Sequence, residues 1–64
     1  MQNQILRRRN ALGLTQQALA EQCAVSRQTI NAIENDKYDP TLRLAFALAR
    51  SLGTTVDELF KGES

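Results

Sequence analysis

The 64-residue sequence has no histidine and no tryptophan, and its only cysteine is Cys23. A single cysteine excludes a disulfide within the chain, and the usual four-ligand zinc sites lack their ligands. Carboxylates are scattered along the chain with no histidine to complete an acid–base or nucleophilic centre. A chain this short also buries only about 60% of its unfolded surface, which leaves little room for a catalytic cleft. We therefore expect no enzyme, no metal site and no cofactor.

Long apolar runs are missing as well. No stretch approaches the roughly 18 apolar residues that span a bilayer. The first four residues, Met-Gln-Asn-Gln, lack the charged-then-apolar order of a signal peptide. We therefore expect a cytoplasmic protein that has no membrane partner.

The charge balance is nearly even, with eight lysines and arginines against seven acidic residues. Taken alone, a net charge of +1 disfavours a partner held mainly by bulk charge. The total hides a gradient: residues 1–37 hold five basic and three acidic groups, whereas residues 38–64 hold three basic and four acidic groups. Any binding to an anionic partner must therefore depend on particular contacts made by the first part of the chain.

Glycine and proline are sparse, and their positions divide the chain into helical segments. The sequence is rich in alanine, leucine, glutamine, arginine and glutamate, which favour helix. Gly13 and Gly53 suit the left-handed residue that closes a helix, and Pro40 excludes helix at the preceding residue. These signals predict five short helices, at about residues 3–12, 16–22, 27–35, 42–52 and 56–60.

The predicted starts of the helices carry capping patterns. Thr41 and Thr55 precede the last two helices as N-cap residues, and Glu58 completes a capping box with Thr55. Thr15 and Ser26 precede the second and third helices, each following an apolar residue that can pack four positions into its helix. These pairs are Leu14 with Leu19 and Val25 with Ile30. Only residues 23–25 separate the two helices, which predicts a tight bend of the helix-turn-helix type.

Three runs of residues carry a family resemblance. Residues 13–20 (GLTQQALA), 25–35 (VSRQTINAIEN) and 40–42 (PTL) occur in this order, flanked by a first and a last helix. Over about residues 5–60 the chain resembles the Cro/CI-type (XRE) helix-turn-helix family of bacterial and phage transcription regulators. It departs from the family at Ala24 and Asp36, where glycine is frequent, which places the details of both turns in question.

The resemblance implies one all-α domain over residues 1–64, with five short helices and a lambda-repressor-like DNA-binding fold. The helix-turn-helix motif then occupies about residues 16–35, and helices at about 42–60 complete the core and pair two subunits. The implied function is that of a sequence-specific regulator of bacterial or phage origin. It would bind double-stranded DNA as a homodimeric repressor on a short palindromic operator.

The third helix carries the residues expected to contact bases. On a helical wheel Ile30 and Ile33 define the core side. In helix-turn-helix docking the N-terminal part of the second helix of the motif enters the major groove. There arginine pairs with guanine, glutamine or asparagine with adenine, and an alanine methyl contacts thymine. An arbitrary helix would merely expose such residues to water, but the resemblance favours base contacts by Arg27, Gln28, Asn31 and Ala32.

A second set of residues is expected to contact the DNA backbone. By resemblance, Gln16 donates to a phosphate, and Asn35 and Lys37 grip the backbone on the other side of the groove. Helix N-termini favour anions, which adds Thr41 at the start of the fourth helix. Arg43 and Arg8 are weaker additions, for which ordinary surface charge is the alternative. The role of Tyr38 stays open between covering the core and offering its hydroxyl to DNA.

Glu34 lies next to the core side of the third helix, where an unpaired carboxylate is costly. In the resembling family, the arginine four residues before the glycine-leucine pair forms an ion pair with the glutamate that ends the third helix. Those positions are Arg9 and Glu34 here. We expect a structural ion pair between the first and third helices.

The fourth helix has a broader apolar arc than one core face needs, spanning roughly 200° of its wheel. Leu42 and Phe46 stand at the far edge of this arc, and the short fifth helix adds further apolar side chains. An exposed apolar patch on so small a monomer marks an interface. We expect a homodimer interface that contains Leu42, Phe46, Val56, Leu59 and Phe60.

The alternatives to a DNA-binding repressor are a helix-turn-helix module that binds only proteins and an antitoxin-like protein with its own partner. A protein-docking helix would carry apolar residues at positions 28, 31 and 32, where only Ala32 qualifies. The chain also has no room for a separate ligand-sensing domain, so no small-molecule ligand is expected.

Overall fold

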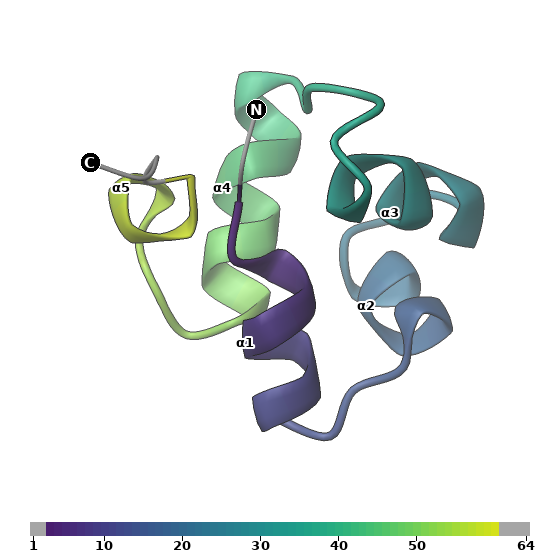
Figure 1. Cartoon of the computed structure of the whole chain (residues 1–64), viewed down its shortest axis with the longest axis horizontal. Coiled ribbons are helices and arrows are strands. Elements are labelled where there is room, and N and C mark those ends of the chain that lie inside the picture. The colour runs from purple at the N-terminus through teal and green to yellow at the C-terminus, as the bar shows by residue number, and fades with distance from the viewer. Residues whose placement is uncertain (1–2, 61–64) are drawn as a thin grey trace.

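The computed structural model describes residues 3–60, which form five helices joined by short turns (Figure 1). Their bounds are α1 Ile5–Ala11, α2 Gln16–Gln22, α3 Arg27–Glu34, α4 Leu42–Ser51 and α5 Val56–Leu59. All five predicted helices are present, and the last four begin at their predicted caps. The hydroxyls of Thr15, Ser26, Thr41 and Thr55 each accept a hydrogen bond from the backbone N–H three residues later, at 3.0–3.2 Å.

The start of α1 differs from the sequence prediction, because the helix begins at Ile5 and not at Asn3. The Asn3 side chain accepts a hydrogen bond from the Ile5 N–H at 3.1 Å and donates one to the Ile33 carbonyl at 2.8 Å. The Gln4 N–H donates to the Leu59 carbonyl at 2.8 Å. These bonds hold residues 3 and 4 across the ends of α3 and α5, outside the helix.

The five helices enclose one small apolar core. In Figure 1, α1 and α4 lie in the middle, with α2 and α3 on one side and α5 on the other. Every helix contributes at least one fully buried side chain, and the largest of these are Ile5, Leu19, Ile30, Ile33, Leu48 and Leu59. No helix within residues 3–60 is long and apolar enough to cross a membrane.

The first four helices end in the same way, through one residue in the left-handed conformation. Gly13, Ala24, Asp36 and Gly53 have φ values of +70°, +59°, +61° and +67°. The N–H of the next residue then donates to the carbonyl five residues back, at 2.8–3.0 Å in all four turns. This pattern is the Schellman motif, which satisfies carbonyls at the end of a helix. The two positions where the family favours glycine are thus left-handed without a glycine.

The turn between α2 and α3 is short because Val25 serves both helices. Its N–H donates to the Ala20 carbonyl at 3.0 Å and closes α2, while its side chain packs against the core just before the Ser26 cap of α3. Because Val25 both closes α2 and directly precedes the cap of α3, no further residue separates the closing bond of one helix from the cap of the next. The crossing of α2 and α3 is therefore set by local backbone geometry as well as by packing.

The left-handed conformation at Ala24 predicts that Ala24→Gly stabilises the chain. Alanine pays a steric cost at positive φ, whereas glycine does not, so we expect the free energy of unfolding to rise by roughly 0.5–1 kcal/mol. For a domain of this size that corresponds to a few degrees in Tm. Urea and thermal unfolding measure the change.

The matched control is Ala18→Gly, which places the same change inside α2 and should lower stability by about 1 kcal/mol. An Ala24→Gly variant that loses stability as Ala18→Gly does would contradict the assigned turn.

Candidate functional site

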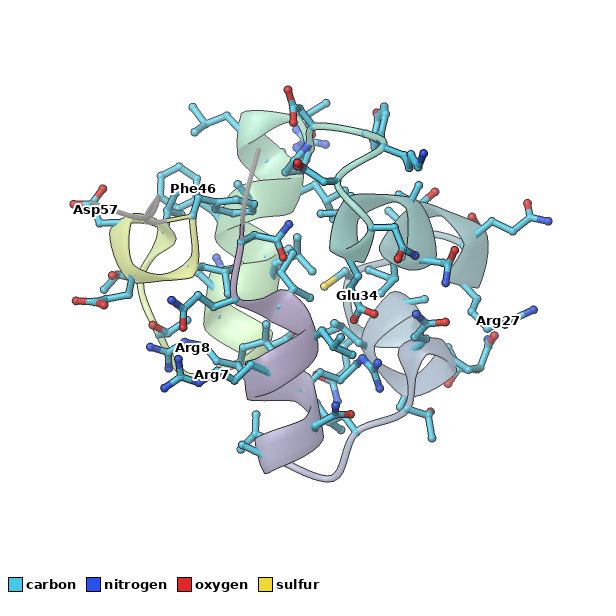
Figure 2. The ribbon with its side chains drawn as sticks, in the orientation of Figure 1. Arg7, Arg8, Arg27, Glu34, Phe46 and Asp57 are labelled. Carbon is cyan, nitrogen blue, oxygen red and sulfur yellow. The ribbon has the colours of Figure 1, made fainter. Side chains whose placement is uncertain are left out.

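The outward face of α3 is polar and open. Arg27, Gln28 and Asn31 are exposed, Ala32 is half-buried, and Ile30 and Ile33 are buried on the opposite side. Figure 2 shows Arg27 pointing away from the body of the molecule. The four residues predicted to contact bases therefore lie on the side of α3 that a partner can reach.

A broad surface hollow of about 610 Å³ adjoins the start of α2. Arg9 and Arg27 line it from α1 and α3, and Gln16 and Gln17 line it from α2. The exposed Arg27 guanidinium and the side-chain amides of Gln16 and Gln17 border this open hollow and suit an anionic group of phosphate size. This hollow adjoins the outward face of α3 through Arg27, so base and backbone contacts can belong to one surface.

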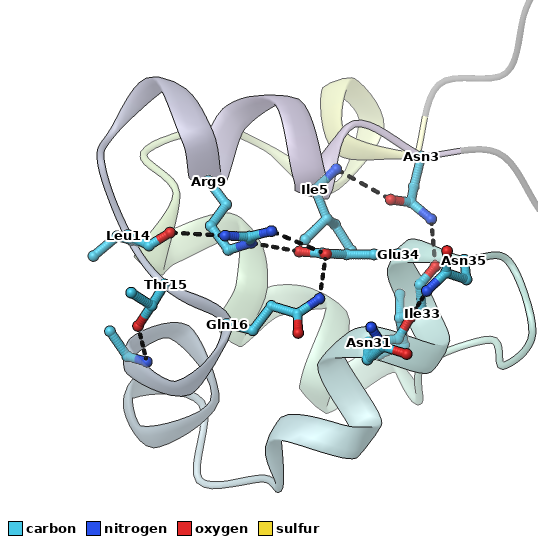
Figure 3. Close-up of polar contacts among 11 residues, drawn as sticks. Asn3, Ile5, Arg9, Leu14, Thr15, Gln16, Asn31, Ile33, Glu34 and Asn35 are labelled. Carbon is cyan, nitrogen blue, oxygen red and sulfur yellow. Dashed lines mark hydrogen bonds and ion pairs between the residues drawn. The ribbon is translucent and has the colours of Figure 1, made fainter.

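Arg9 and Glu34 form the ion pair expected from the sequence. The Arg9 Nε donates to Glu34 Oε2 at 2.7 Å, and Nη2 donates to Oε1 at 3.2 Å (Figure 3). The side chains are only 11% and 3% exposed, respectively. Arg9 Nη1 also donates to the Leu14 carbonyl at 2.9 Å, so one guanidinium joins α1, the turn before α2 and the end of α3.

Gln16 has a second contact that the sequence analysis did not predict. Its side-chain amide donates to Glu34 Oε1 at 2.8 Å, so the Glu34 carboxylate receives donors from both α1 and α2. One N–H of the amide is thereby committed to the fold, while Gln16 also lines the hollow at the start of α2. We use "clamp" for the three residues Arg9, Gln16 and Glu34.

The segment after α3 places several of the expected backbone-contacting residues. The Asn35 side chain donates to the Asn31 carbonyl at 2.8 Å and covers the end of α3. Lys37 and Arg43 are exposed, and the Thr41 hydroxyl caps α4. Tyr38 is 48% exposed. Tyr38 lines one hollow beside α3 and a second whose lining includes Val25 and Leu44.

Arg8 does not belong to this surface. Figure 2 places it on the side of α1 toward α5, far from Arg27 and the outward face of α3. Within the described part of the chain its buried Nε has no hydrogen-bond partner. A backbone contact by Arg8 stays a prediction, but Arg8 lies apart from the other predicted contact residues, because successive residues of α1 point in different directions and Arg9 takes the one toward α3.

Leu59 was expected at a subunit interface, but it is fully buried within the chain. With only four residues, α5 must place Leu59 in the core, and the prediction for this residue is wrong.

Val56 and Phe60 are partly buried against the core. Leu42 and Phe46 are 70% and 53% exposed, and Figure 2 shows Phe46 near α5. A groove of about 240 Å³ runs among Pro40, Leu42, Ala45, Val56 and Phe60.

Cys23 closes α2 and is buried. Burial raises the pKa of its thiol above the ordinary value, and a long contact with the Ser51 hydroxyl, at 3.8 Å, lowers it in part. Since the thiolate is the reactive form, a raised pKa makes this thiol less reactive near neutral pH.

The chain is similar in sequence and in structure to known helix-turn-helix proteins. A helix-turn-helix family profile matches residues 5–59. An uncharacterized HTH-type transcriptional regulator of Methanocaldococcus jannaschii is 47% identical over 60 residues, covering 94% of this chain and 91% of that protein. A similarly described protein of Bacillus subtilis is 33% identical over 60 residues, with 94% and 91% coverage. The solution structure of the P22 C2 repressor DNA-binding domain is 33% identical with a TM-score of 0.84, covering 91% of this chain and 76% of that one.

The sources of these relatives change one expectation. The resemblance implies a bacterial or phage origin, yet archaeal proteins are among the similar sequences, together with a bacterial one. The similarity therefore gives no ground for restricting the source to bacteria and phages.

The clamp predicts a specific pattern of stability in a double-mutant cycle of Arg9→Met and Glu34→Leu. Either single change strands a buried charge and should cost about 3–5 kcal/mol, whereas the double variant should cost less than the sum. Urea unfolding, with an osmolyte added to keep the single variants folded, measures the coupling. Additive losses from the two single changes would refute an energetic link between Arg9 and Glu34.

Proposed function

Since the chain belongs to the Cro/CI-type helix-turn-helix family of DNA-binding transcriptional regulators, we propose that it is a homodimeric repressor that recognises a short palindromic operator through the major groove. The observation that carries this proposal is the outward face of α3, where Arg27, Gln28 and Asn31 stand exposed at the end of a rigid turn. These side chains offer the donors and acceptors that distinguish base pairs in the major groove.

Contacts with the DNA backbone flank this face on two sides. The hollow at the start of α2 brings together Arg27, Gln16 and Gln17, and the segment after α3 adds Lys37 and Arg43. Phosphate contacts of this kind fix the register of a protein on the duplex without reading its sequence. Asn35 and Thr41 support them by finishing α3 and starting α4.

Pairing of two chains through Leu42 and Phe46 fits the same proposal. Both are exposed apolar side chains one helical turn apart on α4, beside the groove lined by Val56 and Phe60. A net charge of +1 gives one chain little affinity for DNA in general. Two linked α3 helices would double the specific contacts and require an inverted repeat with half-sites about 10 base pairs apart.

Similarity to the P22 C2 repressor supports the regulatory part of the proposal. Its DNA-binding domain shares the fold and 33% of aligned residues with this chain. Repression by occupying the operator is the simplest mode consistent with this similarity. The polar face of α3 gives no support to a module that binds only proteins.

Base contact by Gln28 predicts a change of sequence preference in Gln28→Ala. We expect the variant to lose about 1–3 kcal/mol of binding at one base step and to accept other bases there. Selection from a random DNA pool, followed by titration of the selected site, measures both effects. Lys37→Ala is the comparison, since a lost phosphate contact should weaken all sequences equally and lower the salt slope by about one. Unaltered affinity and preference in Gln28→Ala would remove Gln28 from the base-contacting set.

The exposed side chains of Leu42 and Phe46 on α4 predict that the chain forms a dimer. The double substitution Leu42→Ser and Phe46→Ser should turn a dimer into a monomer at concentrations where the unmodified chain is dimeric, as measured by sedimentation velocity. Leu12→Ser is a matched control, because Leu12 is 55% exposed but stands at the far end of α1. A monomeric unmodified chain, or equal loss of dimer in the control, would exclude this interface.

A further inference from the structure

A second, smaller hollow lies against the outward face of α3. It has a volume of about 270 Å³ and connects the helix with the segment that follows it. The residues that line it are Ser26, Gln28, Thr29, Ala32 and Tyr38. Because Gln28 and Ala32 also belong to the predicted base-contacting set, this hollow is continuous with the proposed DNA interface.

The walls of the hollow are mainly apolar in what they offer a ligand. The Ser26 and Thr29 hydroxyls lie 3.0 Å apart and hydrogen-bond to each other, and Ser26 Oγ also accepts from the Thr29 N–H at 3.1 Å. Both hydroxyls are thus engaged in the cap of α3. Ala32 contributes a methyl group, and Tyr38 contributes a half-exposed ring. The side-chain amide of Gln28 is the strong polar group of the hollow.

A side-chain amide next to an apolar surface is suited to contact an A·T base pair in the major groove. There adenine presents N7 and the N6 amino group, which a glutamine amide can bond in pairs, while thymine presents its C5 methyl group. Gln28 and Ala32 are four residues apart, so their side chains are neighbours on one face of α3. A base contacted by Gln28 and a methyl group against Ala32 would therefore lie close together.

We propose that Tyr38, together with Ala32 and Thr29, forms a seat for the C5 methyl group of a thymine next to the base that Gln28 contacts. Tyr38 is then a specificity-determining residue supplied by the segment after α3. This inference rests on the proposed function, because it needs α3 to lie in the major groove. It adds that one operator position is selected by a methyl group and not by a hydrogen bond.

Tyr38 also lines a neighbouring hollow, whose lining includes the apolar Val25 and Leu44 as well as Thr41 and Arg43. Tyr38 therefore borders both the predicted base-contacting residues and two residues predicted to contact the DNA backbone. The competing role for Tyr38 is a hydrogen bond from its hydroxyl to a phosphate, and the experiment below separates the two.

Replacement of thymine by deoxyuridine, one position at a time, tests the seat in the operator obtained by selection. The exchange removes the methyl group and keeps base pairing and the hydrogen-bonding groups of the groove. The full chain is titrated unmodified and as Tyr38→Phe, Tyr38→Ala and Lys37→Ala. We expect the unmodified chain to lose about three- to fivefold in affinity at one thymine of each half-site and little at the others.

The two Tyr38 variants distinguish a role of the aromatic ring from a role of the hydroxyl in binding the operator. Tyr38→Phe keeps the ring and should retain the position-specific loss, whereas Tyr38→Ala should abolish it and bind the unmodified operator about as weakly as the unmodified chain binds the uracil operator. Lys37→Ala should weaken both operators equally and retain their ratio. An unchanged unfolding midpoint in Tyr38→Ala, expected for a half-exposed side chain, shows that the loss is local.

Two other results would overturn the inference. A flat uracil scan with equal losses in Tyr38→Phe and Tyr38→Ala would assign the hydroxyl to a phosphate. A uracil effect that survives in Tyr38→Ala would place the methyl group elsewhere. In both cases an operator has been selected, so the proposed function stands and only the methyl seat fails. If selection enriches no sequence, the proposed function fails and the seat fails with it.

Discussion

The arrangement of the helices depends on one buried carboxylate. Glu34 ends α3 and receives hydrogen bonds from Arg9 of α1 and Gln16 of α2. Arg9 in turn holds the Leu14 carbonyl in the turn before α2. A single charged group therefore ties together three helices. The same bonds place the start of α2 beside the outward face of α3, where the proposed base and phosphate contacts meet.

Local backbone signals made much of this fold predictable from the sequence. Caps such as Thr15 and Ser26 and closing residues such as Gly13 act over four or five residues, so the helix boundaries follow from short patterns. The exposed set on α3 followed in the same way, since Ile30 and Ile33 fix which side faces the core. Ala24 shows the limit of this approach, because the closing bond of the Val25 N–H and the packing of the Val25 side chain hold an exposed alanine at positive φ, where glycine would be expected.

Predictions failed where a residue's place depends on distant parts of the chain. Asn3 has the propensity for a helix start, yet it bonds to Ile33, thirty positions away, and so lies outside α1. Leu59 was assigned to an interface because α5 is short, but the core needed that side chain. Gln16 had no sequence signal for its bond to Glu34.

The central claim is that the clamp and the short turn present the outward face of α3 to the major groove. The most direct measurement is the change in backbone amide chemical shifts when the selected operator is added to the full chain. The account predicts the largest changes at residues 26–32, at the start of α2 and at residues 35–38, with α1 outside the clamp little affected. Largest changes on α1 and α5, with α3 unaffected, would contradict it.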